Sequence, residues 1–195
     1  MARRPGRPDT GPDGAELDGA ELDGTGLLSR AQPGQHRQRS YEWQDPAIPG
    51  AAARTMAGID FFRAIVAGTL PAPPIASTLG FTVASVDEGR VVFEFTPAEF
   101  HYNPIGSVHG GVYATLCDSA CGCAVHSMLP AGAYYTSQDL NVKFLRAITL
   151  ATGQLRCEGT VLHLGSRTAL AEARLSDGAG RLYAHATSSC LIFRP

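Results

Sequence analysis

The residues best suited to chemistry lie in one stretch, 103–128, which reads NPIGSVHGGVYATLCDSACGCAVHSM. Two glycines, Gly110 and Gly111, stand where a helix is expected to begin, so their backbone N–H groups have no intrahelical partner. Glycine lets a ligand approach the backbone closely, and the positive end of the helix dipole attracts a carbonyl oxygen. These residues predict a site that binds a carbonyl oxygen and stabilises negative charge developing on it.

Asp118 is the second reactive group of this stretch. The helix around it is apolar or small on nearly every side, which is typical of a buried helix, and a buried carboxylate is unfavourable unless it is paired or used. Asp118 follows Gly111 by two helical turns, about 10 Å along the axis. This is too far for both groups to act on one carbonyl carbon unless the geometry relaxes. We therefore expect Asp118 to act on a carbonyl held by the helix start of another subunit.

Several residues here also have a purely structural interpretation. His109 is as consistent with a hydrogen-bonded core histidine as with direct chemistry, and glycines at a loop-to-helix junction often serve packing. An isolated aspartate on a helix is often solvated or a cap. Cys117, Cys121 and Cys123 follow no common zinc spacing, and the last two face different sides of a helix, so we expect packing and no metal.

The rest of the chain must position these groups. Apolar periodicity predicts a short helix at 59–68 and one further helical turn at 75–79. Alternating patterns predict strands at 81–86, 90–95, 135–145, 154–164, 168–176 and 182–193. The connections after the long helix are too short for parallel crossovers. The predicted fold class is therefore α+β, with a long central helix wrapped by a curved, mostly antiparallel sheet, and its exposed edges favour association of subunits.

Residues 1–57 differ from the rest in composition. They are rich in Gly, Pro, Asp, Glu and Arg, and the pentapeptide AELDG occurs twice, at 15–19 and 20–24. Such a segment cannot bury enough apolar surface to offset the entropy of ordering it, so we expect a disordered N-terminal extension followed by one domain at 58–195. A calcium-binding or partner-binding tail is the alternative interpretation of the repeat.

The overall composition narrows the class of protein. The chain has 195 residues, 44% of them hydrophobic, and a formal net charge of -2 without a basic patch, so neither nucleic acid nor a membrane surface is an expected partner. No apolar run follows the early arginines, so no secretory signal is expected. Five cysteines form a poor disulfide framework, and we expect free thiols in a cytoplasmic protein.

A longer motif combines these features. The spacing H-x-N-P-x-G-x-x-H-G-G-x6-D is met by His101, Asn103, Pro104, Gly106, His109, Gly110, Gly111 and Asp118. With the later segments YTSQDLNVKFLRAI, HLGSRTALAEARL and GRLYAHATSSCLIF, the span 58–194 resembles the hotdog-fold acyl-CoA thioesterases of the phenylacetate-pathway (PaaI) type. The resemblance implies hydrolysis of an acyl-CoA thioester, with coenzyme A as part of the substrate and no other cofactor.

The resemblance also implies roles for individual residues. Asp118 matches the catalytic carboxylate, as nucleophile or as general base on water, and Gly110 matches the glycine whose N–H polarises the carbonyl. Asn103 matches the residue that orients water or substrate, and His109 is the accompanying motif histidine. Ser137 matches a hydroxyl near the lytic water, with Thr136 as the alternative if the loop shifts by one residue.

Coenzyme A and the partner subunits are also implied by the resemblance. Four residues match the strand-end residues that hold the phosphates of coenzyme A in this family: Arg146, Gly165, Ser166 and Arg167. Many relatives have Gly-Arg-Arg where this chain has Gly-Ser-Arg, so one phosphate contact is missing. A homodimer, paired into a dimer of dimers, is expected. The acyl group is expected between subunits, lined by Tyr113, Leu116 and Met128. Two other functions stay open: a hydratase or dehydratase acting on acyl thioesters, and a non-catalytic acyl-CoA binder.

Overall fold

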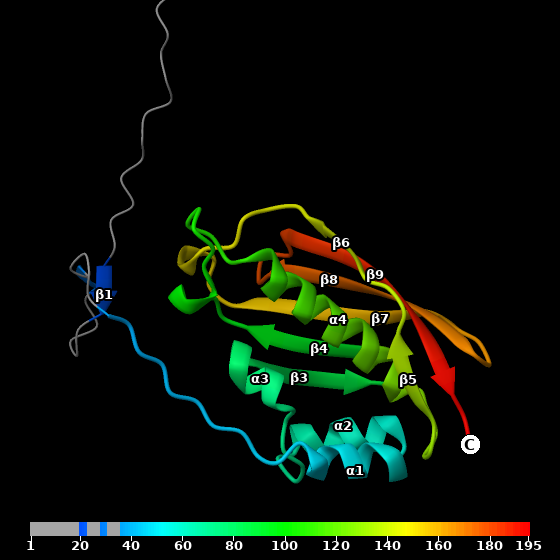
Figure 1. Ribbon diagram of the computed structural model, residues 1–195. Helices are drawn as coiled ribbons and strands as arrows, with labels where there is room; N and C mark the ends of the chain where they lie inside the picture. Colours follow the sequence, from blue (N-terminus) through cyan, green and yellow to red (C-terminus); the bar gives the residue numbers. More distant parts are fainter. Residues whose placement is uncertain (1–19, 23–27, 31–35) are drawn as a thin grey trace, which may run out of the picture. The chain divides into compact units, whose positions relative to one another are not determined.

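The computed structural model describes residues 20–22, 28–30 and 36–195, and the chain divides into two compact units, 1–40 and 41–195 (Figure 1). In the first unit, β1 (Ala20–Leu22) pairs antiparallel with β2 (Leu28–Arg30). Apart from these short strands, the AELDG repeat and the first 35 residues of the predicted extension lie outside the described residues.

Helix α1 (Ala47–Thr55) lies within the range that composition assigns to the extension. The Asp45 carboxylate accepts a hydrogen bond from the Ala47 N–H at 2.9 Å, and Pro49 is buried. The helix contacts α2, so ordered structure begins before the boundary predicted at residue 58. Composition alone did not reveal this helix, because its alanines carry no apolar stripe and its packing supplies the order.

The second unit continues with three more helices and seven strands. They are α2 (Gly58–Val66), α3 (Pro74–Leu79), β3 (Phe81–Asp87), β4 (Arg90–Phe95), α4 (Gly110–Ser127), β5 (Tyr134–Ser137), β6 (Asn141–Phe144), β7 (Leu155–Leu164), β8 (Thr168–Asp177) and β9 (Leu182–Phe193). The strands form one antiparallel sheet in the order β3-β4-β7-β8-β9-β5, and β6 also pairs with β9. Figure 1 shows α4 lying across one face of this sheet. The predicted fold class is confirmed.

Small residues let α4 lie close to the sheet. Leu116, Cys117, Ala120 and Cys121 on its inner face are fully buried. Gly159 on β7 faces this helix, and a Cβ built there would lie 2.1 Å from the Ala120 carbonyl oxygen. The helix therefore sits where only a glycine on β7 leaves room for its backbone.

We expect Gly159→Ala to destabilise the fold by about 3 kcal/mol, because the added carbon meets backbone that cannot move without shifting the whole helix. Urea unfolding measures this change. Gly178→Ala is the matched control, since a Cβ at Gly178 meets nothing within 4 Å. Equal stability of the two variants would contradict this explanation of the helix–sheet contact.

The single strand predicted at 135–145 is two strands, β5 and β6, and this part of the prediction is wrong. Between them, the Asp139 carboxylate accepts a hydrogen bond from the Ser189 N–H at 3.0 Å, and its carbonyl accepts one from the Ser188 hydroxyl at 2.7 Å. Side-chain bonds of this kind replace the regular ladder and interrupt the strand. The interruption sets Ser137 at the end of β5, next to α4.

Candidate active site

The loop before α4 is built around His101. The His101 Nδ1 accepts a hydrogen bond from the Ala98 N–H at 2.9 Å, and Nε2 lies 2.9 Å from the Leu79 carbonyl oxygen. Because a carbonyl can only accept, Nε2 carries the proton. The His101 carbonyl in turn accepts from the His109 N–H at 2.8 Å. The buried His101 therefore fixes the segment that leads into the helix.

Asn103 closes a turn in the same loop. Its side-chain oxygen accepts hydrogen bonds from the backbone N–H groups of Ile105 at 3.0 Å and Ser107 at 3.3 Å. Its amide nitrogen donates to the Ser107 hydroxyl at 3.2 Å. The geometry gives Asn103 a defined task in shaping the loop, beside the predicted task of orienting water or substrate.

His109 is the N-cap residue of α4. Its Nδ1 accepts a hydrogen bond from the Gly111 N–H at 2.9 Å, so one of the two glycine donors expected to be free is already occupied. The ring is exposed, which rules out the core histidine considered from the sequence. A Cβ at Gly111 would lie 2.9 Å from this nitrogen, so glycine is required for the cap to form as it does.

The Gly110 N–H, in contrast, has no hydrogen-bond acceptor within residues 36–195. Gly110 is the first residue of α4, and it lines a cleft of about 320 Å³ together with Asn103, Tyr113, Phe144 and Arg146. A free backbone donor at the positive end of an 18-residue helix, facing a cleft, is suited to bind a carbonyl oxygen.

Asp118 lies two turns further along α4. Its carboxylate accepts a hydrogen bond from the Ser137 hydroxyl at 3.1 Å, so β5 brings a predicted site residue to the carboxylate. The Thr136 side chain is exposed on the strand, where its backbone pairs with Leu191. Of the two hydroxyls considered, Ser137 is therefore the one in contact with Asp118.

The burial expected for Asp118 is wrong for a single chain, where its side chain is exposed. The sheet covers only the inner face of α4, and Gly111, His109 and Asp118 lie along the uncovered face. The small and apolar residues of α4 predict that the helix is covered, but not whether the chain's own sheet or a second copy covers the face that carries Asp118.

Comparison with known proteins identifies the family. A family model described as "Thioesterase superfamily" matches residues 105–184 of this chain. Human acyl-coenzyme A thioesterase 13 is 32% identical over 104 residues, which cover 53% of this chain and 73% of that protein. A structure of a phenylacetic acid degradation-related protein from Ralstonia eutropha JMP134 has a TM-score of 0.61 and 30% identity, covering 67% of this chain and 98% of that chain. The chain belongs to the thioesterase superfamily.

The resemblance to PaaI-type hotdog proteins of this superfamily is thereby confirmed. A Halobacterium salinarum protein is 37% identical over 103 residues, and these cover 50% of this chain and 66% of that protein. These matches cover between 50% and 67% of this chain, so they establish the family and leave the substrate of this thioesterase-superfamily chain to be argued from its own site.

The residues predicted to bind coenzyme A fall into two separate sets. The Arg146 N–H donates to the Tyr183 carbonyl near the start of β9, and the Arg167 carbonyl accepts from the Ile192 N–H near its end. Nine residues of strand separate these two points, about 30 Å. Ser166 and Gly165 belong to the second set, in the hairpin between β7 and β8. The fold of one chain therefore does not bring the two sets to the same phosphate.

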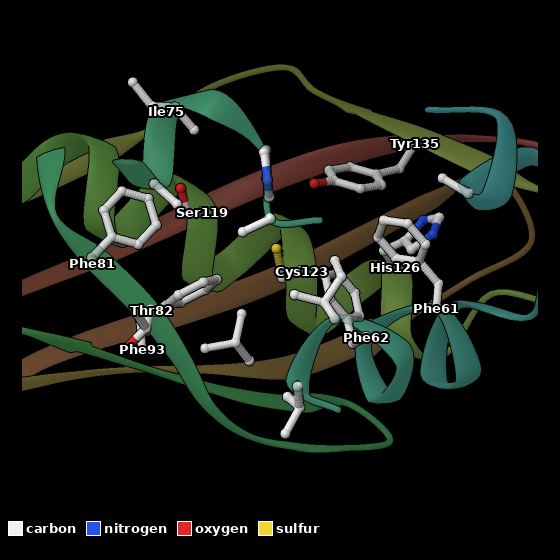
Figure 2. Close-up of a pocket in the computed structure, with 17 residues that line it drawn as sticks. Phe61, Phe62, Ile75, Phe81, Thr82, Phe93, Ser119, Cys123, His126 and Tyr135 are labelled. Atoms are coloured by element: carbon white, nitrogen blue, oxygen red, sulfur yellow. The ribbon is translucent and has the colours of Figure 1, made fainter. Parts of the chain in front are cut away.

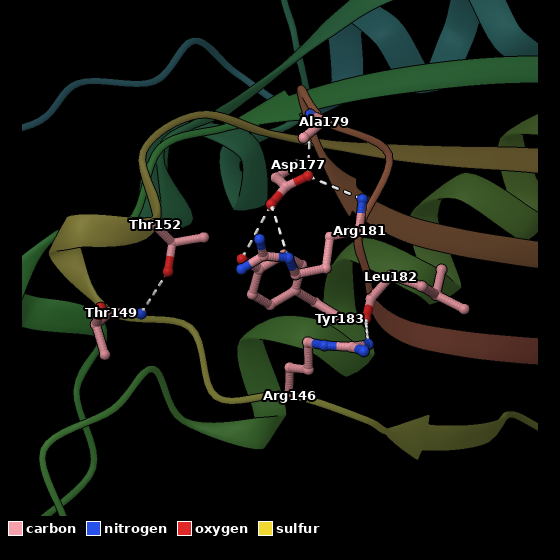
Figure 3. A network of polar contacts seen from close by, with 8 residues as sticks. All are labelled: Arg146, Thr149, Thr152, Asp177, Ala179, Arg181, Leu182 and Tyr183. Carbon is pink, nitrogen blue, oxygen red and sulfur yellow. Dashed lines mark hydrogen bonds and ion pairs between the residues drawn. The ribbon is translucent and has the colours of Figure 1, made fainter.

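Arg146 remains available to an anion. Its guanidinium donates to the Leu182 carbonyl at 2.6 Å, and within the described part of the chain it has no ion-pair partner (Figure 3). The nearby Asp177 is occupied by the N–H groups of Arg181 and Ala179 and by the Tyr183 hydroxyl. These hydrogen bonds, the Arg181 N–H first, hold the pKa of Asp177 below its ordinary value.

Of the three residues expected to line the acyl pocket, Leu116 is contradicted by the structure, whereas Tyr113 lines the cleft beside Gly110. Leu116 is fully buried in the core, and Tyr113 is 4% exposed. The Tyr113 hydroxyl accepts from the Ile148 N–H at 2.7 Å and donates to the Arg146 carbonyl at 3.1 Å, so it braces the loop after β6. Met128 is exposed, with its sulfur near Gly89. Helical position alone did not reveal which face of α4 the sheet would cover.

A cavity of about 450 Å³ lies instead on another side of α4 (Figure 2). Its lining residues come from α1, α2, α3, β3 and β4, and Tyr135 of β5 also lines it. The α4 side chains that face it are Ser119, Cys123 and His126. This cavity could not be predicted from the sequence, because α2 and α3, which line it, are predicted only as short helical segments.

His126 is the most unusual residue of this wall. Its ring packs edge-on against Phe61 and Phe62, each with centroids 5.7 Å away, and its Nε2 is buried without a hydrogen-bond partner in the described residues. Desolvation lowers the pKa of His126 below its ordinary value of 6.5. The folded protein therefore holds this imidazole in its neutral form.

This burial predicts acid-sensitive stability. Because the pKa of His126 is lower folded than unfolded, its stabilising contribution is complete above about pH 6.5 and is lost as the pH falls below that value. We expect His126→Phe to weaken the fall in melting temperature between about pH 7 and pH 5, without a loss at pH 7, since the unpaired nitrogen is removed. His163→Gln, at an exposed histidine, is the control. Identical pH profiles for wild type and His126→Phe would contradict the prediction.

Among the residues that the structure describes, no three His, Cys, Asp or Glu side chains lie close enough together to hold a metal ion. In the same part, no helix has both the length and the apolar character needed to cross a membrane.

Proposed function

We propose that this chain hydrolyses acyl-CoA thioesters to a free acid and coenzyme A, at a site shared between two copies. The observation that carries the proposal is the pair formed by the unpaired Gly110 N–H and the exposed, Ser137-bonded Asp118 carboxylate on one helix. Sequence similarity to human acyl-coenzyme A thioesterase 13 supports the substrate class.

The geometry of α4 favours a shared site. Gly110 and Asp118 are eight residues apart, about 12 Å along the helix axis, which exceeds the reach of two groups that act on one carbonyl. Both lie on a helix whose outer face the sheet leaves open. A second copy with its helix antiparallel to the first would place Asp118 of each copy beside Gly110 of the other.

The sheet edge supports the same association. β5 and β6 lie at this edge with β9 as their only strand partner in the described sheet. Tyr134 of β5 is 53% exposed and Phe144 of β6 is 57% exposed, and Leu145, which directly follows β6, is 49% exposed. Open backbone groups beside exposed apolar side chains favour pairing with another chain. We infer a homodimer through this edge, which can pair again into a dimer of dimers.

In the proposed reaction, the thioester oxygen accepts a hydrogen bond from the Gly110 N–H. The Asp118 carboxylate of the other copy either attacks the carbonyl carbon or removes a proton from a water molecule that attacks it. In either case the C–S bond breaks, and coenzyme A leaves as a thiolate that takes up a proton. After direct attack, the acyl group is left as an anhydride with Asp118, which water then hydrolyses to the free acid and the carboxylate. After attack by water, the free acid forms at once. The Ser137 hydroxyl orients the carboxylate, Asn103 and His109 hold the loop and the helix start, and Arg146 contacts a phosphate of coenzyme A.

A hydrolysis screen tests this function. The purified full chain is mixed with aryl-CoA and fatty acyl-CoA thioesters, and released thiol is measured. We expect turnover of at least one class, together with a dimer or tetramer mass in solution. A chain that binds these thioesters without releasing thiol would instead be the non-catalytic acyl-CoA binder.

A further inference from the structure

The cavity described above lies next to the proposed catalytic carboxylate. Ser119, which lines it, directly follows Asp118, and Ser119, Cys123 and His126 follow one stripe of α4 with helical spacing. On β5, Tyr135 lines the cavity and Ser137 bonds Asp118. Residues two apart on a strand point to the same face and lie about 7 Å apart. A group bound at Asp118 could therefore extend into this space.

The lining determines what the cavity can hold. Its walls are mainly rings and aliphatic side chains, as Figure 2 shows for Phe61, Phe62, Phe81 and Phe93. None of the described residues that line it is a Lys, Arg, Asp or Glu. Burial raises the pKa of the Cys123 thiol to about 12, and that of His126 is lowered, so both are neutral. A charged occupant would find no counter-ion here, and its desolvation would be unfavourable.

We infer that this cavity receives the acyl group of the thioester, and that the acyl group is apolar and uncharged at its far end. The inference rests on the proposed function, because it assigns the substrate of the same site. The volume of about 450 Å³ lies within the usual range for small-molecule pockets. The rings of α2 and the aliphatic residues of α3 form the outer wall and thereby set the longest acyl group that fits.

The expected preference follows from burial. Each methylene that leaves water for an apolar wall strengthens binding about fourfold until the cavity is full. Octanoyl-CoA should therefore be hydrolysed with a kcat/KM at least tenfold higher than acetyl-CoA. Octanedioyl-CoA, which has the same chain length with a carboxylate at its far end, should be at least tenfold worse than octanoyl-CoA.

Two substitutions fill the cavity from different walls. Cys123→Phe adds a ring from α4, and Ile65→Trp adds one from α2. Each is expected to reduce the ratio of kcat/KM for octanoyl-CoA over acetyl-CoA at least tenfold. Arg63→Trp is the matched control, because Arg63 lies on the same helix, is exposed and does not line the cavity, so this variant should keep the wild-type ratio. Thermal melting identifies any variant that fails to fold. If one of the two filling variants does not fold, the kcat/KM ratio of the other tests the inference.

The inference is overturned if folded filling variants keep the wild-type ratio, or if octanedioyl-CoA is used as well as octanoyl-CoA. A binding measurement separates this failure from failure of the proposed function. Calorimetry with the Asp118→Asn chain should show octanoyl-CoA binding at least tenfold tighter than acetyl-CoA, and adding Cys123→Phe should remove the difference. If that holds while the wild type releases no thiol, the acyl cavity stands and the hydrolase proposal falls. If thiol is released without any chain-length difference, the reverse is true.

Discussion

Asp118→Asn is expected to lower kcat for acyl-CoA hydrolysis by about 10³-fold. The amide matches the carboxylate in shape and can still meet the Ser137 hydroxyl, but it can neither attack a carbonyl carbon nor take a proton from water. Because Asp118 is exposed in the single chain, the melting temperature should stay close to that of wild type. Thiol release from the best substrate of the screen measures the effect.

Ser137→Ala is the graded comparison for this variant. It removes the hydrogen bond of 3.1 Å that orients the carboxylate and leaves the carboxylate itself in place. We expect a loss of about tenfold, the order of one hydrogen bond to a charged group. An Asp118→Asn enzyme with wild-type kcat would remove Asp118 from the chemistry, whatever Ser137→Ala does.

Gly110→Pro is expected to lower kcat by about 10²-fold to 10³-fold, the usual effect of losing one oxyanion donor. Proline removes the N–H of Gly110 and adds ring carbons next to Phe144, and the backbone accepts it because Gly110 is the first residue of α4, a position where proline is well tolerated. The preceding His109 already has the extended conformation that proline requires of its neighbour, with φ -62 and ψ 138. Kinetics and thermal melting on the same sample measure the effect.

Gly110→Ala is the matched control, since it adds a Cβ at the same place and keeps the N–H. That Cβ would lie 3.1 Å from the Phe144 ring, which is 57% exposed and free to move aside. We expect the alanine variant to stay within about tenfold of wild type, the loss expected for a hydrogen bond that is kept but displaced. If proline and alanine reduce kcat equally, the loss comes from crowding at the helix start and the N–H has no role.

The local elements could be predicted because their patterns depend on neighbouring residues. The turn residues before Gly110 and the apolar run after it define α4, and alternation defines the hairpins of β3–β4 and β7–β9. The spacing of the long motif predicts that Gly110 and Asp118 lie on one helix, and α4 contains both. These parts of the site could be predicted because they depend only on the spacing of residues that are close together in the sequence.

The predictions that were wrong or missing share a physical cause: each feature depends on contacts between residues that are distant in the sequence. The break between β5 and β6 comes from Asp139 bonding to β9, about fifty residues away. The exposure of Asp118 and the burial of Leu116 depend on which face of α4 the sheet covers. Likewise, α1 and the cavity arise from the packing of short segments whose own helix preference is weak.

The shared site can be tested most directly with hybrid dimers. Asp118→Asn and Gly110→Pro chains, each inactive alone, are co-expressed with different tags, and dimers that carry both tags are purified. In such a dimer one site has both defects and the other pairs an intact Asp118 with an intact Gly110 from the opposite chain. We predict about half of the wild-type rate per dimer, because one of two symmetric sites is restored. Hybrid dimers as inactive as their parents would contradict a site built from two copies.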